Sequence, residues 1–179
     1  MQIPSYDTWL AGERATAAKL NKNIRDAGNF VKGVPFGFAY LTAATSIPNG
    51  STWIGINVDT EQYDNDNMFV SSTPGRLTIQ TPGMYYIEGQ IRYGSDSTNQ
   101  SKARAGRIQT VSGGSSTDLD TQYMAAAPNN STQVYLKGYR QLAAGDYITL
   151  SALHYEAVAE NLQVGSQHYT YIRARWMNA

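Results

Sequence analysis

Apolar and polar residues alternate over much of the chain, and the clearest case is the stretch of residues 74–93. From Tyr85 to Tyr93, every second residue is apolar, aromatic or glycine, while the residues between them are mostly polar. Alternation at period two is typical of a strand with one buried face. Pro82 and Gly83 interrupt the pattern and suit the corners of a tight turn, so we expect a sheet edge or corner there.

A second stretch, residues 140–153, has the same arrangement. Gly145 and Asp146 form the interruption, and Ile148, Leu150 and Ala152 share one face of the strand that follows. Together the two stretches indicate a fold built from strands and tight turns.

The same reasoning along the chain predicts nine short strands. They are expected at residues 36–42, 52–58, 76–80, 84–93, 103–110, 121–125, 132–140, 146–155 and 168–177. Glycine, proline and asparagine separate them, for example at residues 48–50 and 113–114. Many short strands without helical periods between them favour an all-β fold, an antiparallel jelly-roll sandwich, over residues 35–179.

Residues 1–34 differ from the rest and are predicted to form an N-terminal attachment or stalk segment with a short α-helix. Thr16 can cap a helix that runs to about Val31. Its apolar seam has spacings of three, four, three and four, at Ala17, Leu20, Ile24, Ala27 and Val31. A lone helix of this length is marginal in water, so it packs on its own β domain, on copies of itself or on a partner.

Length and composition bound the function. The 179 residues suffice for one domain with a short appendage. The formal net charge is zero and no block of basic residues occurs, so nucleic acid is not an expected partner. Cysteine is absent, which excludes disulfides and thiolate metal sites. We find neither a signal peptide nor a membrane-spanning stretch, and we expect a soluble product made in the cytoplasm without membrane insertion.

Candidate chemistry is sparse. The carboxylates of Asp59, Glu61, Asp64 and Asp66 are weak calcium candidates, because that ion prefers clustered oxygen ligands, but a solvated acidic loop is the simpler interpretation. The two histidines, His154 and His168, lack the spacing of a zinc site, and we expect them at the surface or at an interface.

Signs of catalysis are also missing. No G-x-S-x-G elbow, cysteine nucleophile or phosphate-binding loop occurs, so we predict a protein that is not an enzyme and has no cofactor. One enzymatic alternative stays open, since two carboxylates that converge in space could cleave a glycan. The candidates for such a pair are Glu88, Asp96, Asp118, Asp120, Glu156 and Glu160.

Ordered motifs give the β region a likeness to a known family. They are the segments at 53–70, 75–79, 82–87 and 142–150, followed by a closing aromatic strand. In this order they resemble the globular head of the C1q and tumour necrosis factor (TNF) family. The resemblance implies a ten-strand jelly roll that forms a homotrimer. The 13 tyrosines suit half-buried surfaces that meet another subunit, and Tyr86, Tyr169 and Tyr171 are candidates for the subunit interface.

A second likeness concerns the leader. Residues 9–26, with Thr16-Ala17-Ala18 followed by Leu20-Asn21, resemble the N-terminal segments of bacteriophage tail, fibre and other minor structural proteins. This resemblance implies a virion protein made in the host cytoplasm, attached to other virion proteins through its N-terminal segment.

These inferences combine into one leading hypothesis and two alternatives. The leading hypothesis is a homotrimeric bacteriophage structural protein, in the tail, in a fibre or decorating the capsid. Its exposed loops at residues 94–102, 112–119 and 156–167 are expected to contact a host-surface glycan or protein. The alternatives are a fibre-borne glycan hydrolase and a soluble cytokine-like trimeric ligand.

Overall fold

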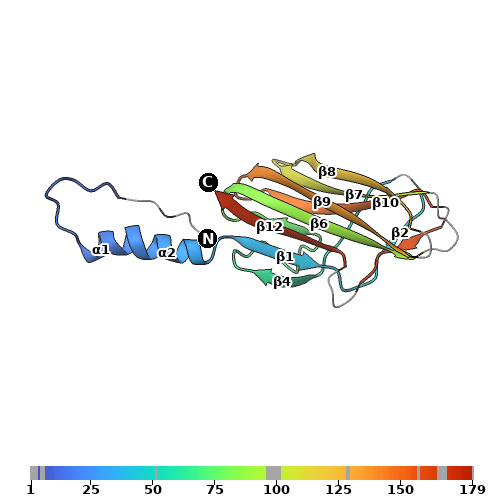
Figure 1. Cartoon of the computed structure of the whole chain (residues 1–179), viewed down its shortest axis with the longest axis horizontal. Helices are drawn as coiled ribbons and strands as arrows, with labels where there is room; N and C mark the ends of the chain where they lie inside the picture. Colours follow the sequence, from blue (N-terminus) through green and yellow to red (C-terminus); the bar gives the residue numbers. More distant parts are fainter. Residues whose placement is uncertain are drawn as a thin grey trace.

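The chain folds into a β-sandwich with a helix projecting from one end (Figure 1). The computed structural model describes residue 4 and residues 7–50, 52–95, 102–127, 130–156, 158–164 and 169–178, with Lys32 described by its backbone alone. The strands are β1 (Phe36–Tyr40), β2 (Ser46–Ile47), β3 (Ile54–Gly55), β4 (Thr60–Asp64), β5 (Arg76–Thr78), β6 (Gly83–Ser95), β7 (Ala103–Ser112), β8 (Ser115–Ala125), β9 (Ser131–Leu142), β10 (Tyr147–His154), β11 (Glu160–Asn161) and β12 (Tyr171–Asn178).

Two five-stranded sheets form the sandwich. In sheet I the order is β4-β1-β12-β6-β9. Sheet II has the order β3-β10-β7-β8, and β5 also pairs with β10. All these pairs are antiparallel, and β2 and β11 form a separate two-stranded pair. The predicted jelly-roll sandwich with ten strands in its two sheets is therefore confirmed over the described residues.

The core lies between the two sheets, on the faces that alternation predicted. Along β6, the side chains of Tyr85, Ile87, Ile91 and Tyr93 are fully buried, whereas the residues between them are mostly half-buried on the outer face. The Tyr85 hydroxyl donates to the Thr81 carbonyl at 2.6 Å, so burying this ring leaves no unpaired hydroxyl. Burial also raises the pKa of this phenol above its ordinary value.

The two predicted turns are corners that carry the chain between the sheets. The turn at Pro82 and Gly83 connects β5 in sheet II to β6 in sheet I, and the turn at Gly145 connects β9 in sheet I to β10 in sheet II. The Gly145 amide donates to the Ile79 carbonyl at 2.8 Å, and the Ile79 amide donates to the Asp146 carbonyl at 2.7 Å. These two bonds fix the corners side by side.

The predicted helix is present, but it is not uniform. It consists of α1 (Ala17–Leu20), a π-helical segment (Asn21–Asp26) and α2 (Ala27–Lys32). Thr16 caps it as predicted, by accepting a hydrogen bond from the Lys19 amide. A π turn holds more residues than an α turn, so the spacing of the predicted seam does not keep its members on one face.

Several strand predictions need correction. The stretch around Glu61 was expected to be an acidic loop, but β4 lies there and pairs with β1. The polar tract 112–117 was expected to be a loop, yet only Gly113 and Gly114 turn, and β8 begins at Ser115. In both places polar side chains occupy strands with an exposed face, which removes the alternation that marks a strand. Of the predicted strand 52–58, only Ile54–Gly55 is a strand.

No helix within the described residues is long and apolar enough to cross a membrane.

Candidate functional site

The outer face of sheet I carries an unusual density of aromatic rings. Pairing across the strands places these side chains at three levels. The first level holds Phe36, Arg175, Tyr86 and Tyr139, the second holds Phe38, Arg173, Glu88 and Lys137, and the third holds Tyr40, Tyr171, Gln90 and Tyr135. We call this surface the aromatic face.

Rings on neighbouring strands contact one another across the aromatic face. The ring centroids of Tyr86 and Tyr139 lie 4.9 Å apart, and those of Phe38 and Tyr171 lie 5.3 Å apart. Tyr63, Tyr135 and Tyr139 remain 51%, 59% and 63% exposed. Monomeric soluble proteins rarely expose a contiguous aromatic surface of this kind. Where such a surface occurs, it commonly marks a binding site or a subunit interface.

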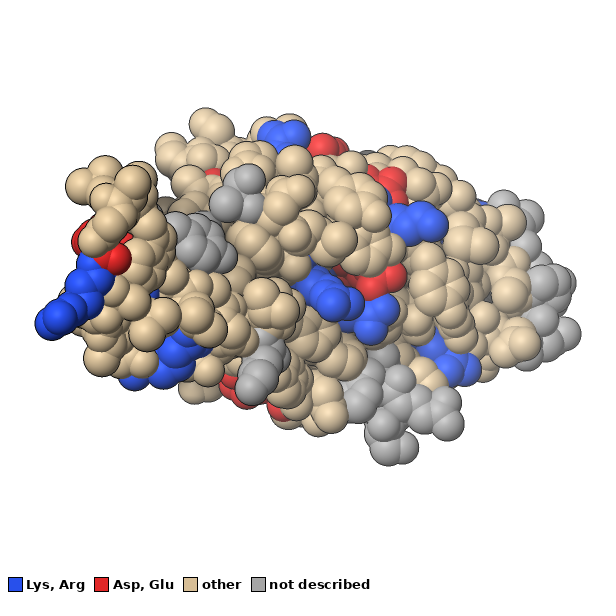
Figure 2. Space-filling model, turned by 60° about the vertical axis from the view of Figure 1, so that its left-hand side comes forward, with Lys and Arg blue, Asp and Glu red and all other residues tan. Residues whose placement is uncertain are grey.

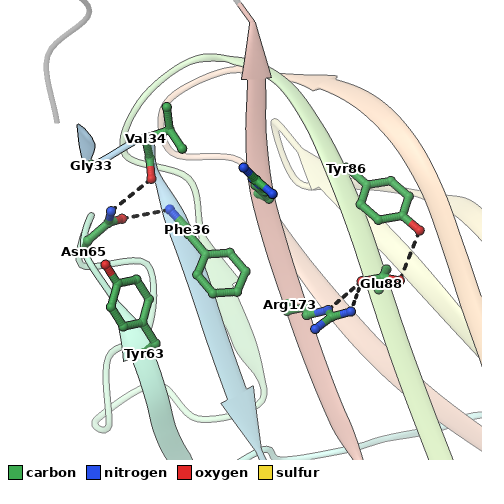
Figure 3. A pocket seen from close by; sticks show the side chains of 9 residues that line it. Gly33, Val34, Phe36, Tyr63, Asn65, Tyr86, Glu88 and Arg173 are labelled. Carbon is green, nitrogen blue, oxygen red and sulfur yellow. Dashed lines mark hydrogen bonds and ion pairs between the residues drawn. The ribbon is translucent and has the colours of Figure 1, made fainter. Parts of the chain in front are cut away.

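A charged group lies in the middle of these rings. The Arg173 Nε donates to Glu88 Oε2 at 2.5 Å, and the Tyr86 hydroxyl donates to Glu88 Oε1 at 3.0 Å (Figure 3). Both carboxylate oxygens of Glu88 are therefore engaged. Loss of solvation raises the pKa of the Tyr86 phenol, and its hydrogen bond to Glu88 raises it further, so this hydroxyl stays neutral at physiological pH.

Two hollows flank the Tyr86 and Glu88 side chains. The first has a volume of about 490 Å³ and is lined by Gly33, Val34, Phe36, Tyr63, Asn65, Tyr86, Glu88, Arg173 and Arg175. The second measures about 470 Å³ and lies on the other side, toward Asp120, Tyr135 and Lys137. The aromatic face therefore contains two hollows, one on each side of Tyr86 and Glu88.

The first hollow is built at the junction between the helix and the sandwich. The Asn65 side chain accepts from the Phe36 amide at 2.8 Å and donates to the Val34 carbonyl at 2.9 Å (Figure 3). One amide side chain thereby fixes the linker that leads from the helix into β1. Sequence reasoning missed Asn65, because neither partner is near it in the chain.

The predicted interface residues have different positions. Tyr86 and Tyr171 lie on the aromatic face. Tyr169 lies just before β12, where its ring is covered by the Arg92 guanidinium at 3.9 Å and its carbonyl accepts from Gln90. Tyr169 and Tyr171 thus lie close to Gln90, whereas Tyr86 lies two levels away on the same face. Sequence reasoning missed the more exposed Tyr135 and Tyr139.

The predicted helix seam does not pack on the sandwich. Leu20, Ile24 and Val31 are 42%, 66% and 73% exposed, while Ala17 is exposed and Ala27 is half-buried. The buried residue of the helix is Phe30, which sequence reasoning missed and whose ring meets Trp176 edge-on at 4.9 Å. The helix thus contacts the head at its C-terminal end and leaves the seam uncovered.

The calcium candidates are not gathered into one site. Asp59 accepts hydrogen bonds from the amides of Thr42 and Ala43, whereas Asp64 accepts from the Asp66 and Phe69 amides. Asp66 is buried and Glu61 is exposed. In the part of the chain that the structure describes, no group of three or more Asp, Glu, His or Cys side chains is placed to hold a metal ion.

The expectation that His154 lies at the surface or at an interface is wrong. His154 is fully buried, its Nε2 lies 2.8 Å from the Ile47 carbonyl, and its Nδ1 accepts from the Glu156 amide at 3.1 Å. Nearby, the buried Arg104 pairs with Glu160 at 3.2 Å, a core ion pair that no sequence pattern signals. His168 lies outside the described residues.

Comparison with known proteins identifies the fold. No family model matches the sequence, and no curated protein matches it either. Solved structures do match. The globular domain of zebrafish complement 1qA has a TM-score of 0.59 and 14% identity, with 80% of this chain and 97% of that one covered. Murine APRIL gives 0.61 and 14%, with 80% and 99% covered. Eiger TNF from S. frugiperda gives 0.61 and 10%, with 82% and 95% covered.

The fold is a C1q/TNF-like jelly roll. At these identities the likeness establishes the fold and nothing finer, since one fold serves many functions. In the C1q/TNF-like head of this chain, the aromatic face and its two hollows are the candidate functional site.

Proposed function

We propose that this chain forms a non-enzymatic homotrimeric head, with the aromatic faces of three copies packed around a common axis. The observation that supports it most is the exposure of Tyr63, Tyr135 and Tyr139 on the same sheet face. Aromatic residues are enriched in subunit interfaces, and in a closed threefold ring every copy buries the same pair of neighbouring surfaces. The homotrimer implied by the resemblance to C1q and TNF heads agrees with this arrangement, and structures of those heads share the fold.

The N-terminal segment serves as the attachment in this proposal. The helix projects away from the sandwich (Figure 1), and its Leu20, Ile24 and Val31 side chains are exposed. Because the helix leads directly into β1 of sheet I, three copies around the axis would bring their helices close together. The uncovered seam is then available to sister helices or to another protein.

The virion remains our proposed setting, on the strength of the phage-like leader. In that setting the helix attaches to the particle and the far end of the sandwich projects outward. Strands β6 and β10 end at this far end of the sandwich, beside a hollow of about 480 Å³ lined in part by Ser95 and Glu160. The third predicted contact segment, 112–119, belongs to the hairpin between β7 and β8 at the opposite end, so it does not join them.

Two measurements test this function. The mass of the purified chain in solution is expected to be three times the 19.6 kDa of one chain. An antibody against the β head is expected to label purified phage particles. A monomeric mass would overturn the assembly, and particles that contain none of this protein would overturn the virion setting.

A soluble cytokine-like ligand is the second candidate, because APRIL and Eiger TNF are among the structural neighbours. It predicts secretion of the chain from its native cell and binding to a receptor on another cell. Recovery of the trimer in the culture medium, with none in particles, would favour this candidate over the virion protein.

A glycan hydrolase has one observation in its favour. Glu88 and Asp120 line the same hollow, which gives a pair of carboxylates on one surface. However, Arg173 and Tyr86 both donate hydrogen bonds to the Glu88 carboxylate. The Asp120 carboxylate likewise accepts hydrogen bonds from the Lys137 amide and the Gln122 side chain. Loss of host polysaccharide on incubation with the wild type, and its survival with Glu88→Gln, would establish this activity.

A further inference from the structure

The aromatic face carries an excess of positive charge. Its strands β6, β9 and β12 carry four outward basic side chains, those of Arg92, Lys137, Arg173 and Arg175, against one outward carboxylate, that of Glu88. A second carboxylate, that of Asp120 on β8, lines the hollow beside Lys137, so the basic side chains still outnumber the acidic ones. Figure 2 shows basic and acidic side chains side by side in the middle of a mostly uncharged surface. The chain as a whole has equal numbers of acidic and basic residues, so this excess is local.

The groups around Arg175 leave it without a counter-charge. Arg173 and Tyr86 already occupy both oxygens of Glu88, and across the strands Arg175 meets two aromatic residues, Phe36 and Tyr86. Among the described residues, Arg175 forms no ion pair. A guanidinium exposed to water needs no partner, but one enclosed between subunits does, because an uncompensated buried charge costs several kcal/mol.

Assembly around a threefold axis sharpens this requirement. The proposed function, on which this inference rests, would enclose three copies of Arg175 at one level of the trimer. Like charges at the same level repel, and aromatic surroundings of low dielectric constant strengthen that repulsion. The hollow beside each Arg175 has room for a small molecule, at about 490 Å³.

We propose that this hollow binds a small oxyanion (a phosphate, sulfate or carboxylate) between the subunits, with the Arg175 guanidinium as its principal ligand. Arginine presents a planar fork of N–H donors that matches two oxygens of such an anion. Phe36, Tyr63 and Tyr86 form the uncharged walls of the hollow. The Asn65 amide is already bonded to the backbone on both sides, so the positive side chains dominate the recognition.

The test uses the full chain in chloride buffer, with inorganic phosphate, sulfate or acetate added at matched ionic strength. The anions that bind are expected to raise the melting temperature of the wild-type trimer by a few degrees, because a ligand specific for the folded assembly stabilises it. Arg175→Gln is expected to remain trimeric and to lose this increase. Arg175→Lys keeps the positive charge but lacks the planar guanidinium, and it is expected to retain only part of the increase in melting temperature.

A matched control separates this effect from the general stabilising action of sulfate and phosphate. Arg140 lies on β9 of the same sheet and pairs with Tyr85, so it is outside the rows of residues that form the aromatic face. Arg140→Gln therefore removes one positive charge from the sheet but none from the hollow. It is expected to respond to the anions as the wild type does. Broadening of the phosphorus NMR signal of phosphate by the wild type, but not by Arg175→Gln, measures binding directly.

The outcomes separate this inference from the trimer on which it rests. An equal anion response in the wild type and in Arg175→Gln would overturn the anion site while leaving the trimer in place. If Arg175→Gln destabilised the trimer in every buffer, the anion site would also be overturned, since the counter-charge of Arg175 would then be a carboxylate of a neighbouring copy. A monomeric wild type would overturn the trimer, and with it the site between subunits.

Discussion

At the scale of single residues, Trp176 connects three parts of the chain that are distant in sequence. Its indole Nε1 donates to the Pro82 carbonyl at 3.1 Å, and its ring packs edge-on against Phe30 of the helix. The same indole occupies the space where a side chain at position 83 would lie. The corner, the helix and the last strand therefore depend on one another through this ring.

Gly83→Ala tests that dependence. A Cβ at position 83 would lie 2.1 Å from Trp176 Nε1 and 2.5 Å from the Asn178 carbonyl oxygen, and the φ of 152° is unfavourable for alanine. Because one of these atoms belongs to the backbone, we expect a loss of at least about 2 kcal/mol in the free energy of unfolding. Urea denaturation measures this loss, and Gly55→Ala, where a Cβ meets nothing within 4 Å, is the control.

Asp59 is expected to make part of the free energy of unfolding depend on pH. Burial raises the pKa of Asp59, but hydrogen bonds from Ala43, Thr42 and Thr60 outweigh that effect, so the pKa lies below the ordinary aspartate value of 3.8. The folded state therefore holds the ionised form more strongly than the unfolded state does. This stabilisation is present above pH 3.8 and is lost as the pH falls through the lower pKa of the folded state.

Asp59→Asn checks this assignment. Since the side chain is only half-buried, we expect a loss of no more than about 1 kcal/mol at neutral pH. The difference in unfolding free energy between variant and wild type should shrink toward pH 3. A difference that stays constant with pH would contradict the role given to the charge.

At the scale of elements, the outer strands and the helix were harder to predict than the core strands. The core strand β6 alternates over most of its length and β10 over its first four residues, because one face is buried there and the other is partly open. By contrast, β4 lies at the edge of sheet I, with three of its five residues exposed, and its sequence shows no alternation. Pattern reasoning succeeds where burial is one-sided and fails at an edge.

Phe30→Ala tests how the helix is held. Phe30 is 8% exposed and contacts the head, whereas its neighbour Val31 is 73% exposed. Removing the Phe30 ring is expected to cost roughly 2 kcal/mol of docking free energy. Hydrogen exchange should accelerate over residues 17–32, with the strands unchanged. Val31→Ala is the control, and equal acceleration in both variants would mean that the Phe30 contact does not hold the helix.

At the scale of the whole molecule, the two sheets have different roles in our proposal. Sheet I presents the aromatic face to sister copies, and sheet II is left on the outside of the trimer. The ends of the sandwich differ as well, since the helix leaves from one end and strands β6 and β10 terminate at the other. This polarity suits a head that is attached at one end and exposed at the other.

Tyr139→Arg tests the assembly. Tyr139 is 63% exposed in the single chain, so a long polar side chain there leaves the fold of one copy intact. It adds a cation to a face that already has an excess of them, and we expect the mass in solution to fall from trimer to monomer. Tyr123→Arg, at a 54% exposed position on β8 of sheet II, should stay trimeric. Two trimeric variants would exclude the aromatic face as the interface.

The sequence by itself determined which residues of β6 and β10 face the core, where the chain turns between sheets, and where the helix begins. Each of these depends on near neighbours: alternation along β6, the Pro82-Gly83 pair, and the Thr16 cap. Local interactions of this kind are visible in one stretch of sequence.

Only the tertiary structure decided which side chains meet across strands. Glu88 and Arg173 are 85 residues apart in the chain, and His154 lies 107 residues from its partner Ile47. The aromatic face exists because strands remote in sequence pair in one register and bring their outward residues to one surface. Register is fixed by the packing of all strands together, so no single segment specifies it.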